Sequence, residues 1–395
     1  MQKIKSIVVN NLDIHVWNLS LGSDVEVDEN CISPVASLLD DLQSKYNLVF
    51  VVAGTNKSVD SSNVQRIGSP ADSINSIVVN SVDKDNRPAS YCRIGPALGF
   101  FIKPDLSYYG GDKENPLFVY WDHARRTNSG TSFAAPLISR KLCYLIDVLN
   151  IDRESAKALL ISSAIQFDNN QNVDAKSMGF GVVPIKIQDI VDAKDDEIKF
   201  IIKCKSKKYF TYDYSLPVPI ENKKFPYSVK AVFCYFPSCN RNQGVDYTGT
   251  ELEFKIGKIT EGKENKKEIT LHDETDNQYA AYLSEENARK VFRKWDNVKV
   301  IKTKYSSRSG MKAKDNEKWG IRIAYFDRDK GRNDNGELPE ISWGLVVTLK
   351  ALDHRNRIDS FINNCSFNQW LVTKISIKER VTVYNQMEET IHFDK

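Results

Sequence analysis

Apolar residues in the first half of the chain gather in short runs. Strands of a parallel sheet are buried on both faces and carry apolar residues almost without interruption. Three runs fit this description: His15–Gly22, Leu48–Val52 and Ser76–Val79. We therefore predict that the first half is built on a parallel sheet.

Helical periodicity lies between and after these strands. Residues 34–46 repeat apolar side chains at the spacing of one helical face, and Ser33–Pro34 is typical of a helix start. Two more helices are predicted over 132–149 and 153–163. Strands that alternate with helices predict an α/β fold with helices packed against the sheet.

The segment Met1–Asn11 contains a short apolar run after two lysines. The run is shorter than the apolar core of a signal peptide, and no small-residue cleavage site follows it. We expect it to form the first strand. Because no stretch of the sequence stays apolar for the thickness of a bilayer, no membrane partner is predicted.

From Ile198 onward, polar and apolar residues alternate with the period of half-buried strands. The clearest examples are Ser228–Cys234, Trp319–Tyr325 and Trp343–Leu349. Turn-rich segments such as 327–336 separate these strands. This pattern predicts a C-terminal β-sandwich.

The charged stretch Lys194–Glu197 separates the two patterns. It marks the predicted boundary between an α/β domain of residues 1–195 and a β-rich accessory domain of residues 196–395. Short helices are also predicted in the second domain, near 284–294 and 357–364.

Composition and charge exclude several classes of partner. The net charge is +3, with an acidic first half and a basic second half. A modest basic excess is more typical of a solvated surface than of a nucleic-acid site, so no nucleic-acid partner is expected. The 7 cysteines lack the paired spacing of a zinc site, and most are predicted to be buried small hydrophobic residues or free thiols, which fits a reducing cytoplasm. We expect no metal and no cofactor.

The string Ser129–Pro136 places a serine at the start of a predicted helix. Gly130 allows a tight turn, and Ser132 then lies where free backbone N–H groups favour a developing negative charge. Pro136 is expected within the first helical turn, where no intrahelical hydrogen bond is lost. A serine presented in this way can attack a carbonyl carbon if a base removes its proton.

Gly130–Pro136 reads Gly-Thr-Ser-x-Ala-Ala-Pro and resembles the nucleophile signature of the subtilisin-like serine peptidases of family S8. Lys103–Asp105 and Met178–Pro184 resemble further segments of the family in the same order, and the resemblance covers about residues 7–193. It implies an incomplete subtilisin-like parallel sheet with flanking helices. It also implies a serine endopeptidase that acts on extended polypeptides, with Ser132 as the nucleophile.

The resemblance extends to an oxyanion site. Val51–Asn56 resembles the strand that ends in the oxyanion asparagine, although the family reads Ala-Ala-Gly-Asn where this chain reads Ala-Gly-Thr-Asn. Asn56 would donate to the oxyanion beside the Ser132 backbone N–H. Losing one such donor in a subtilisin slows the reaction about 100- to 1000-fold. A turn or capping role is the alternative for Asn56.

An extended peptide would lie along a substrate-binding strand. Main-chain pairing of this kind binds peptides with little demand on their sequence. The residues implied to bind substrate are Ser20, Leu21, Gly22, Gly130 and Thr131.

The catalytic Asp and His of this family precede the serine along the chain. No Asp-Ser/Thr-Gly or His-Gly-Thr motif occurs in this sequence. His15 is predicted at the start of a strand and His123 in a loop nine residues before Ser132, and the other three histidines lie in the second half. Without a base, Ser132 is not activated at neutral pH. We expect the missing segment to precede Met1 and its absence to leave apolar sheet edges exposed.

Three interpretations stay open. The chain is a truncated or complemented serine endopeptidase that is inactive alone, a catalytically dead pseudopeptidase that binds peptides, or a partner-binding module of the β-rich domain. Tyr247 and Trp343–Gly344 resemble the C-terminal extension of some bacterial intracellular family members, which implies a cytoplasmic location. The implied protein partners are an N-terminal complementing fragment and an ATPase.

Overall fold

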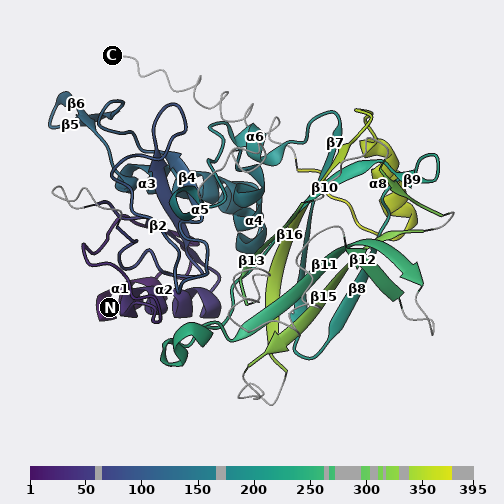
Figure 1. The fold of residues 1–395 in the computed structure, drawn as a ribbon, viewed down its shortest axis with the longest axis horizontal. Helices are drawn as coiled ribbons and strands as arrows, with labels where there is room; N and C mark the ends of the chain where they lie inside the picture. Colours follow the sequence, from purple (N-terminus) through teal and green to yellow (C-terminus); the bar gives the residue numbers. More distant parts are fainter. Residues whose placement is uncertain are drawn as a thin grey trace, which may run out of the picture.

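The computed structural model describes residues 1–57, 65–165, 175–261, 267–271, 295–302, 310–314, 317–328 and 338–375 (Figure 1). The first half is built on a four-stranded parallel sheet with the order β1-β2-β3-β4. Its strands are β1 (Val16–Leu19), β2 (Val49–Ala53), β3 (Ile77–Val82) and β4 (Leu106–Tyr109). The first three coincide with the predicted strands, and the predicted α/β class is confirmed.

Helices cover both faces of this sheet, because alternate residues of a strand point to opposite sides. Val51 of β2 packs in one apolar cluster with α3 (Thr131–Cys143). Phe50 packs in another with α2 (Pro34–Lys45). All five residues of β2 are buried, as its continuous apolar sequence predicts.

The helix boundaries follow local signals in the sequence. The Ser33 hydroxyl accepts a hydrogen bond from the Ala36 N–H at 3.4 Å and caps α2. Asp152 accepts from the Ser155 N–H at 2.8 Å and caps α4 (Arg153–Ser163). α3 continues into a π-helical turn, η1 (Tyr144–Val148), so the three predicted helices are confirmed.

The N-terminal segment is a helix, α1 (Gln2–Val9), and the prediction of a first strand there was wrong. Ile4, Ile7 and Val8 recur at spacings of three and four residues, which is the period of one helical face. Val8 is buried in the cluster that contains α2, whereas Ile7 stays exposed.

Smaller elements complete the first half. Strands β5 (Leu117–Trp121) and β6 (Ala124–Asn128) form a hairpin that projects away from the sheet just before α3 (Figure 1). Two short helices, α5 (Ala175–Met178) and α6 (Ile187–Val191), lead toward the second half.

The second half contains two four-stranded antiparallel sheets, with the orders β13-β10-β16-β7 and β12-β11-β15-β8. The first is formed by β7 (Glu197–Lys207), β10 (Tyr227–Tyr235), β13 (Val298–Lys302) and β16 (Glu340–Ala351). The second is formed by β8 (Thr211–Leu216), β11 (Thr250–Glu261), β12 (Lys267–Leu271) and β15 (Trp319–Asp327). The three strands predicted most clearly from the sequence lie within β10, β15 and β16 and are confirmed.

The remaining described elements of the second half are short. They are a two-stranded ribbon of β9 (Lys224–Phe225) and β14 (Met311–Lys312), a 3-10 segment, η3 (Arg241–Asp246), and helix α8 (Ile358–Phe367). Helix α8 confirms the prediction near 357–364. The helix predicted near 284–294 lies outside the described residues.

Alternate side chains of β10 pack on opposite sides and thereby connect the two halves. Ala231 and Phe233 face an apolar cluster shared by the two antiparallel sheets. Val232 and Cys234 face the opposite way and join the cluster that contains α3 and α4. The seven cysteines form no disulfide and are free thiols.

Helix α4 packs against β10 and β16, and the backbones come unusually close there. A Cβ placed on Gly344 of β16 would lie 2.3 Å from the Ser155 N, so only glycine fits. On α2, the buried Asp40 accepts a hydrogen bond from the Tyr247 hydroxyl at 2.6 Å. The second half is therefore fixed to the first by both apolar and polar contacts.

Candidate functional site

Ser132 is the second residue of α3, where backbone N–H groups lack intrahelical partners. The chain reaches this position through a braced loop, in which the Gly130 N–H donates to the Gly110 carbonyl at 3.1 Å. A Cβ on Gly110 would lie 2.7 Å from the Gly130 carbonyl oxygen, so a side chain there would push the loop apart. The sequence prediction that the helix starts beside Ser132 is confirmed.

Asn56 follows β2 and lies directly beside the start of α3. Its Oδ1 accepts two hydrogen bonds from Thr131, one from the backbone N–H at 3.3 Å and one from the hydroxyl at 3.0 Å. The Nδ2 group is thereby turned away from Thr131. Within the part of the chain that the structure describes, Nδ2 donates to no acceptor, so its hydrogens are available to a ligand beside Ser132.

The segment after β1 also reaches the start of α3. The Ser20 hydroxyl donates to the Ser132 carbonyl at 3.2 Å and accepts from the Asn18 amide at 3.0 Å. Leu21 is 66% exposed, so the backbone on this side faces solvent. The structure thus brings the predicted substrate-binding segment and the predicted nucleophile together.

Pro136 explains why the Ser132 carbonyl is free to accept this bond. The sequence prediction placed Pro136 in the first helical turn, but it is the sixth residue of α3, and that prediction was wrong. A proline there has no N–H for the carbonyl four residues earlier, which is that of Ser132. The Ser20 hydroxyl replaces the missing donor and ties β1 to α3.

Thr131 was predicted to bind substrate, and the structure gives its side chain another contact. Its side chain is buried, at 1% exposure, and its hydroxyl donates to Asn56. Thr131 therefore orients the Asn56 amide. The sequence alone did not indicate this contact, because it joins residues 75 positions apart.

His123 does not lie at Ser132. It forms the turn between β5 and β6 with Asp122, and both residues have positive φ. Five residue pairs separate this turn from the base of the hairpin at Asn128. At about 3.4 Å per residue, the hairpin carries His123 about 17 Å beyond Asn128.

His15 forms an ion pair with Asp147, at 2.9 Å, at the far end of the helix. Asp147 follows Ser132 by fifteen residues in α3 and η1, a rise of about 22 Å. His354 pairs with Asp196 at 2.9 Å in the second half. His272 and His392 lie outside the described residues. Among the described residues, the Ser132 hydroxyl makes no hydrogen bond.

Buried charges support the sheet behind the site. Lys103 and Asp105 form an ion pair at 2.6 Å, and both are 2% exposed. Burial lowers the pKa of Lys103, and the Asp105 carboxylate opposes this shift. Lys103 Nζ also donates to the Ile74 and Ser76 carbonyls at 3.2 and 2.8 Å. These contacts hold β3 and the segment before β4 together, which fixes the loops that lead to α3.

Two buried titratable groups near the site, Tyr91 and Cys92, favour their neutral forms. The Tyr91 hydroxyl lies 2.7 Å from both Ser81 Oγ and the Gly111 carbonyl, and burial raises its pKa. Burial also raises the pKa of the Cys92 thiol to about 12. Neither group is therefore available as a base for Ser132 at neutral pH.

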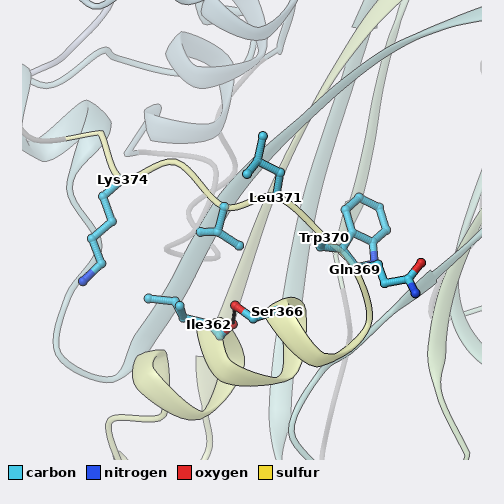
Figure 2. A pocket seen from close by; sticks show the side chains of 7 residues that line it. Ile362, Ser366, Gln369, Trp370, Leu371 and Lys374 are labelled. Carbon is cyan, nitrogen blue, oxygen red and sulfur yellow. Dashed lines mark hydrogen bonds between the residues drawn. The ribbon is translucent and has the colours of Figure 1, made fainter.

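The described residues offer little elsewhere for a ligand. Within them, no group of three or more His, Cys, Asp or Glu side chains is arranged to hold a metal ion. An open pocket lies between α8 and the segment that follows it (Figure 2). It is lined by Ile362, Ser366, Gln369, Trp370, Leu371, Val372 and Lys374. Over the described ranges, no helix is both long and apolar enough to cross a bilayer.

Comparisons with known proteins bear on the first half. Residues 1–182 match the model of the subtilase family. Among solved structures, the prenylagaramide maturation protease PagA is 19% identical with a TM-score of 0.38, and the match covers 47% of this chain and 63% of that one. The patellamide maturation protease PatA is 19% identical with a TM-score of 0.36, covering 47% of this chain and 64% of that one. This chain thus spans less than two thirds of either. No curated protein matches the chain.

Proposed function

Because residues 1–182 match the model of the subtilase family, we propose that this chain carries the nucleophile and oxyanion half of a serine endopeptidase site. Ser132 is the proposed nucleophile. The Ser132 backbone N–H and Asn56 Nδ2 are the proposed donors to the oxyanion of the tetrahedral intermediate. The observation that carries the proposal is the pair of hydrogen bonds from Thr131 to Asn56, which leaves Nδ2 free beside the start of α3.

The proposed substrate is an extended polypeptide. It would pair with the backbone of Ser20–Gly22, the segment that follows β1. The Ser20 hydroxyl donates to the Ser132 carbonyl and so holds this segment beside the start of α3. Gly130, at the N-cap of α3, adds no side chain that could block this approach. Backbone pairing would hold the scissile carbonyl between Ser132 and Asn56. The attack by Ser132 would then be effectively unimolecular, because the reacting groups are already positioned.

The chain lacks a base at Ser132 among its described residues, so the proposal includes an external source of Asp and His. The open edge of β1 supports this part, because β2 is the only strand that pairs with it in the part of the chain that the structure describes. Exposed apolar residues gather in the first 25 positions: Ile7, Leu12, Ile14, Leu21 and Val25. A complementing segment that covers this surface would supply the missing residues. An ATPase partner and a cytoplasmic location complete the proposal.

The role of the second half is also a proposal. We treat residues 196–395 as an accessory domain that buttresses α2 and α4, since Tyr247 donates to Asp40 and α4 packs against β10 and β16. This arrangement gives the accessory domain a direct effect on the stability of the proposed peptidase part.

Intact-mass analysis after treatment with a fluorophosphonate tests the catalytic proposal. The wild-type chain alone is expected to stay unlabelled, and added imidazole is expected to act as an external base and produce one adduct at Ser132. Ser132→Ala should give none. Fast labelling without imidazole would contradict the missing base. An absence of labelling under all conditions would instead favour a pseudopeptidase that binds peptides.

The pseudopeptidase is the second candidate, and it is favoured because the Ser132 hydroxyl has no hydrogen-bond partner among the described residues. In that case a fluorescent extended peptide would bind to the wild-type chain and to Ser132→Ala with equal affinity, and neither would cut it. A complemented endopeptidase would differ, because cleavage with a complementing segment would require Ser132.

A further inference from the structure

The Tyr91 hydroxyl is held by hydrogen bonds beside the proposed site, although it cannot serve there as a base. It lies 2.7 Å from the Gly111 carbonyl oxygen and 2.7 Å from Ser81 Oγ. Because burial raises the pKa of Tyr91, the hydroxyl keeps its proton and donates to the Gly111 carbonyl, which only accepts. The Ser81 hydroxyl is positioned to donate to Tyr91 in turn. These contacts tie Tyr91 to the segment that follows β4.

The segment that this hydroxyl holds also supports the start of α3. Gly110, next to Gly111, accepts a hydrogen bond from the Gly130 N–H at 3.1 Å. A Cβ on Gly110 would lie 2.7 Å from the Gly130 carbonyl oxygen, so the two segments are in close contact. Gly130 is the N-cap of α3 and precedes Ser132 by two residues. A shift of Gly110 and Gly111 would therefore displace the backbone N–H of Ser132.

The main chain of Tyr91 reaches the other proposed oxyanion donor. Its carbonyl oxygen accepts a hydrogen bond at 2.7 Å from the N–H of Lys57, which directly follows Asn56. Asn56 itself pairs with Cys92 in an isolated antiparallel bridge. The Lys57 side chain adds a further link, because its Nζ donates to the Ser90 carbonyl at 3.0 Å. Tyr91 therefore contacts the Asn56 segment through its backbone and the segment that supports α3 through its side chain.

A second pair of hydrogen bonds holds the Tyr91 segment independently of its hydroxyl. The Ser90 N–H and the Ser90 hydroxyl donate to the Asp112 carboxylate at 3.0 and 2.9 Å. Partial burial acts to raise the pKa of Asp112, but its hydrogen bonds outweigh this effect and lower the pKa, so the carboxylate is ionised at neutral pH. Because these bonds remain when the Tyr91 hydroxyl is removed, Tyr91→Phe is expected to fold.

We propose that Tyr91 is a positioning residue that sets the separation between the Asn56 amide and the Ser132 backbone N–H. The inference rests on the proposed function and adds a residue to its site. The two donors must point to a single oxyanion, so a small displacement of either one reduces its contribution. Tyr91 does not touch the reacting atoms. It acts because its carbonyl and its hydroxyl join the two segments that carry the donors.

The kinetics of fluorophosphonate labelling test the inference. Intact mass gives the labelling rate at one imidazole concentration over a series of probe concentrations, which separates the maximal rate from the half-saturating concentration. Tyr91→Phe should lower the maximal rate about tenfold, the effect of one lost hydrogen bond, and leave the half-saturating concentration near that of wild type. Tyr46→Phe is the matched control, because Tyr46 is also partly buried and its hydroxyl makes no hydrogen bond among the described residues.

A double variant separates positioning from a general loss of structure. In Asn56→Ala one of the two donors is absent, so their separation no longer matters. Tyr91→Phe should therefore slow labelling less than about twofold in the Asn56→Ala background, against about tenfold in wild type. A residue that only stabilises the fold would slow both backgrounds by the same factor. Thermal melting of each variant checks that it is folded.

Amide hydrogen exchange provides a readout that does not need an activated serine. The Gly130 N–H donates to the Gly110 carbonyl, and the Thr131 N–H donates to Asn56 Oδ1. Loss of the Tyr91 hydroxyl loosens both contacts, so a peptide that covers residues 129–133 should exchange about tenfold faster in Tyr91→Phe than in wild type. Mass spectrometry of the exchanged and digested protein measures this rate, and Tyr46→Phe should leave it unchanged.

Equal labelling rates for Tyr91→Phe and wild type, or equal slowing in both backgrounds, would overturn the inference. A change confined to the half-saturating concentration would overturn it too, as would an exchange rate at residues 129–133 that Tyr91→Phe leaves unaltered. If wild type stays unlabelled even with imidazole while Tyr91→Phe still exchanges faster, the catalytic proposal alone is refuted, because the exchange does not depend on Ser132 chemistry.

Discussion

The orientation of the Asn56 amide depends on Thr131. Both the backbone N–H and the hydroxyl of Thr131 donate to Asn56 Oδ1, which directs Nδ2 away from them. Without these donors, the Asn56 amide could rotate and present its oxygen to a developing oxyanion. The two oxygens would then repel each other. The proposed oxyanion donor is thus controlled by a residue that does not touch the oxyanion.

Replacing Thr131 with valine tests this dependence. Thr131→Val removes the hydroxyl bond at nearly constant volume. The loss of one hydrogen bond, about 1 to 1.5 kcal/mol, should slow imidazole-dependent labelling of Ser132 about tenfold. Thr131→Ser keeps the hydroxyl and serves as the control, with a rate near that of wild type. Equal rates for Thr131→Val and wild type, measured by intact mass over time, would show that the hydroxyl does not set the amide orientation.

Single residues were predicted well where the signal is local. The string from Gly130 to Pro136 predicts a helix start at Ser132, because turn and helix preferences act within a few residues. The contact between Thr131 and Asn56 spans 75 positions and exists only once β2 is placed beside α3.

Among the elements, α4 has the central position. It begins at the Asp152 cap, and the Asp152 carboxylate accepts from both the Ser155 N–H at 2.8 Å and the Ser155 hydroxyl at 3.0 Å. The helix packs against β10 and β16, and its first turn meets β16 at Gly344. The start of this helix therefore affects the stability of both halves.

Asp152→Ala should lower the free energy of unfolding by about 1 kcal/mol, within the range of about 0.5 to 2 kcal/mol for a lost cap. Urea unfolding followed by circular dichroism measures the change. Asp13→Ala removes an exposed carboxylate from a loop and is the control, with an expected change near zero. Equal unfolding curves for Asp152→Ala and wild type would contradict the capping role.

Strand β7 and helix α6 meet at Lys199, whose Nζ donates to the Ile190 carbonyl at 2.5 Å. Burial lowers the pKa of Lys199 to about 8. In the unfolded chain the pKa is about 10.4. Between these values the unfolded chain holds more protons than the folded chain, so this group makes the fold more stable as the pH rises.

The melting temperature of wild type should therefore gain relative to that of Lys199→Met when the pH is raised from about 7.5 to about 9.5. All other titrating groups are common to both proteins and cancel in the difference. Differential scanning fluorimetry at the two pH values provides the comparison. A difference between the proteins that does not change with pH, or that changes in the opposite direction, would show that Lys199 keeps its ordinary pKa.

Two predictions from the sequence were wrong, and each has a physical reason. Residues 2–9 are too short to distinguish a strand from a helix by apolar content, and the burial of Val8 against the α2 cluster decides for the helix. Pro136 lies one turn deeper in α3 than predicted, and its cost is offset by the Ser20 hydroxyl. In both cases a tertiary contact overrides the local preference.

At the scale of the whole molecule, polar contacts lock the two halves together. Tyr247 donates to the buried Asp40, and the Asn297 amide donates to the Ile74 carbonyl at 3.2 Å. Burial raises the pKa of Asp40, while its hydrogen bonds oppose that rise. A buried carboxylate that loses a donor retains the cost of its desolvation, so each of these bonds affects the stability of the assembly.

Tyr247→Phe should destabilise the protein by about 1.5 to 3 kcal/mol, the range for a hydrogen bond to a charged group. Chemical denaturation of wild type and variant measures the difference. Tyr209→Phe is the control, because Tyr209 is 65% exposed, and it should change little. A Tyr247→Phe variant as stable as wild type would mean that the hydroxyl contributes nothing to the contact between the halves.

The architecture of each half could be predicted from the spacing of apolar residues along its sequence. The contact between the halves could not be predicted in this way. Alternation along β10 indicates a strand with two apolar faces, yet it does not reveal that Val232 faces α4 while Phe233 faces the second sheet. The approach of β16 to α4 depends on the absence of a side chain at Gly344, which becomes meaningful only beside Ser155.

The central claim is that Ser132 has its oxyanion donors but no base within the described chain. The rate of fluorophosphonate labelling as a function of imidazole concentration, for wild type and Asn56→Ala, tests it most directly. The account predicts labelling of wild type that rises with imidazole from near zero, and a rate about 100-fold lower in Asn56→Ala. Labelling that is independent of imidazole, or indifferent to Asn56, would contradict it.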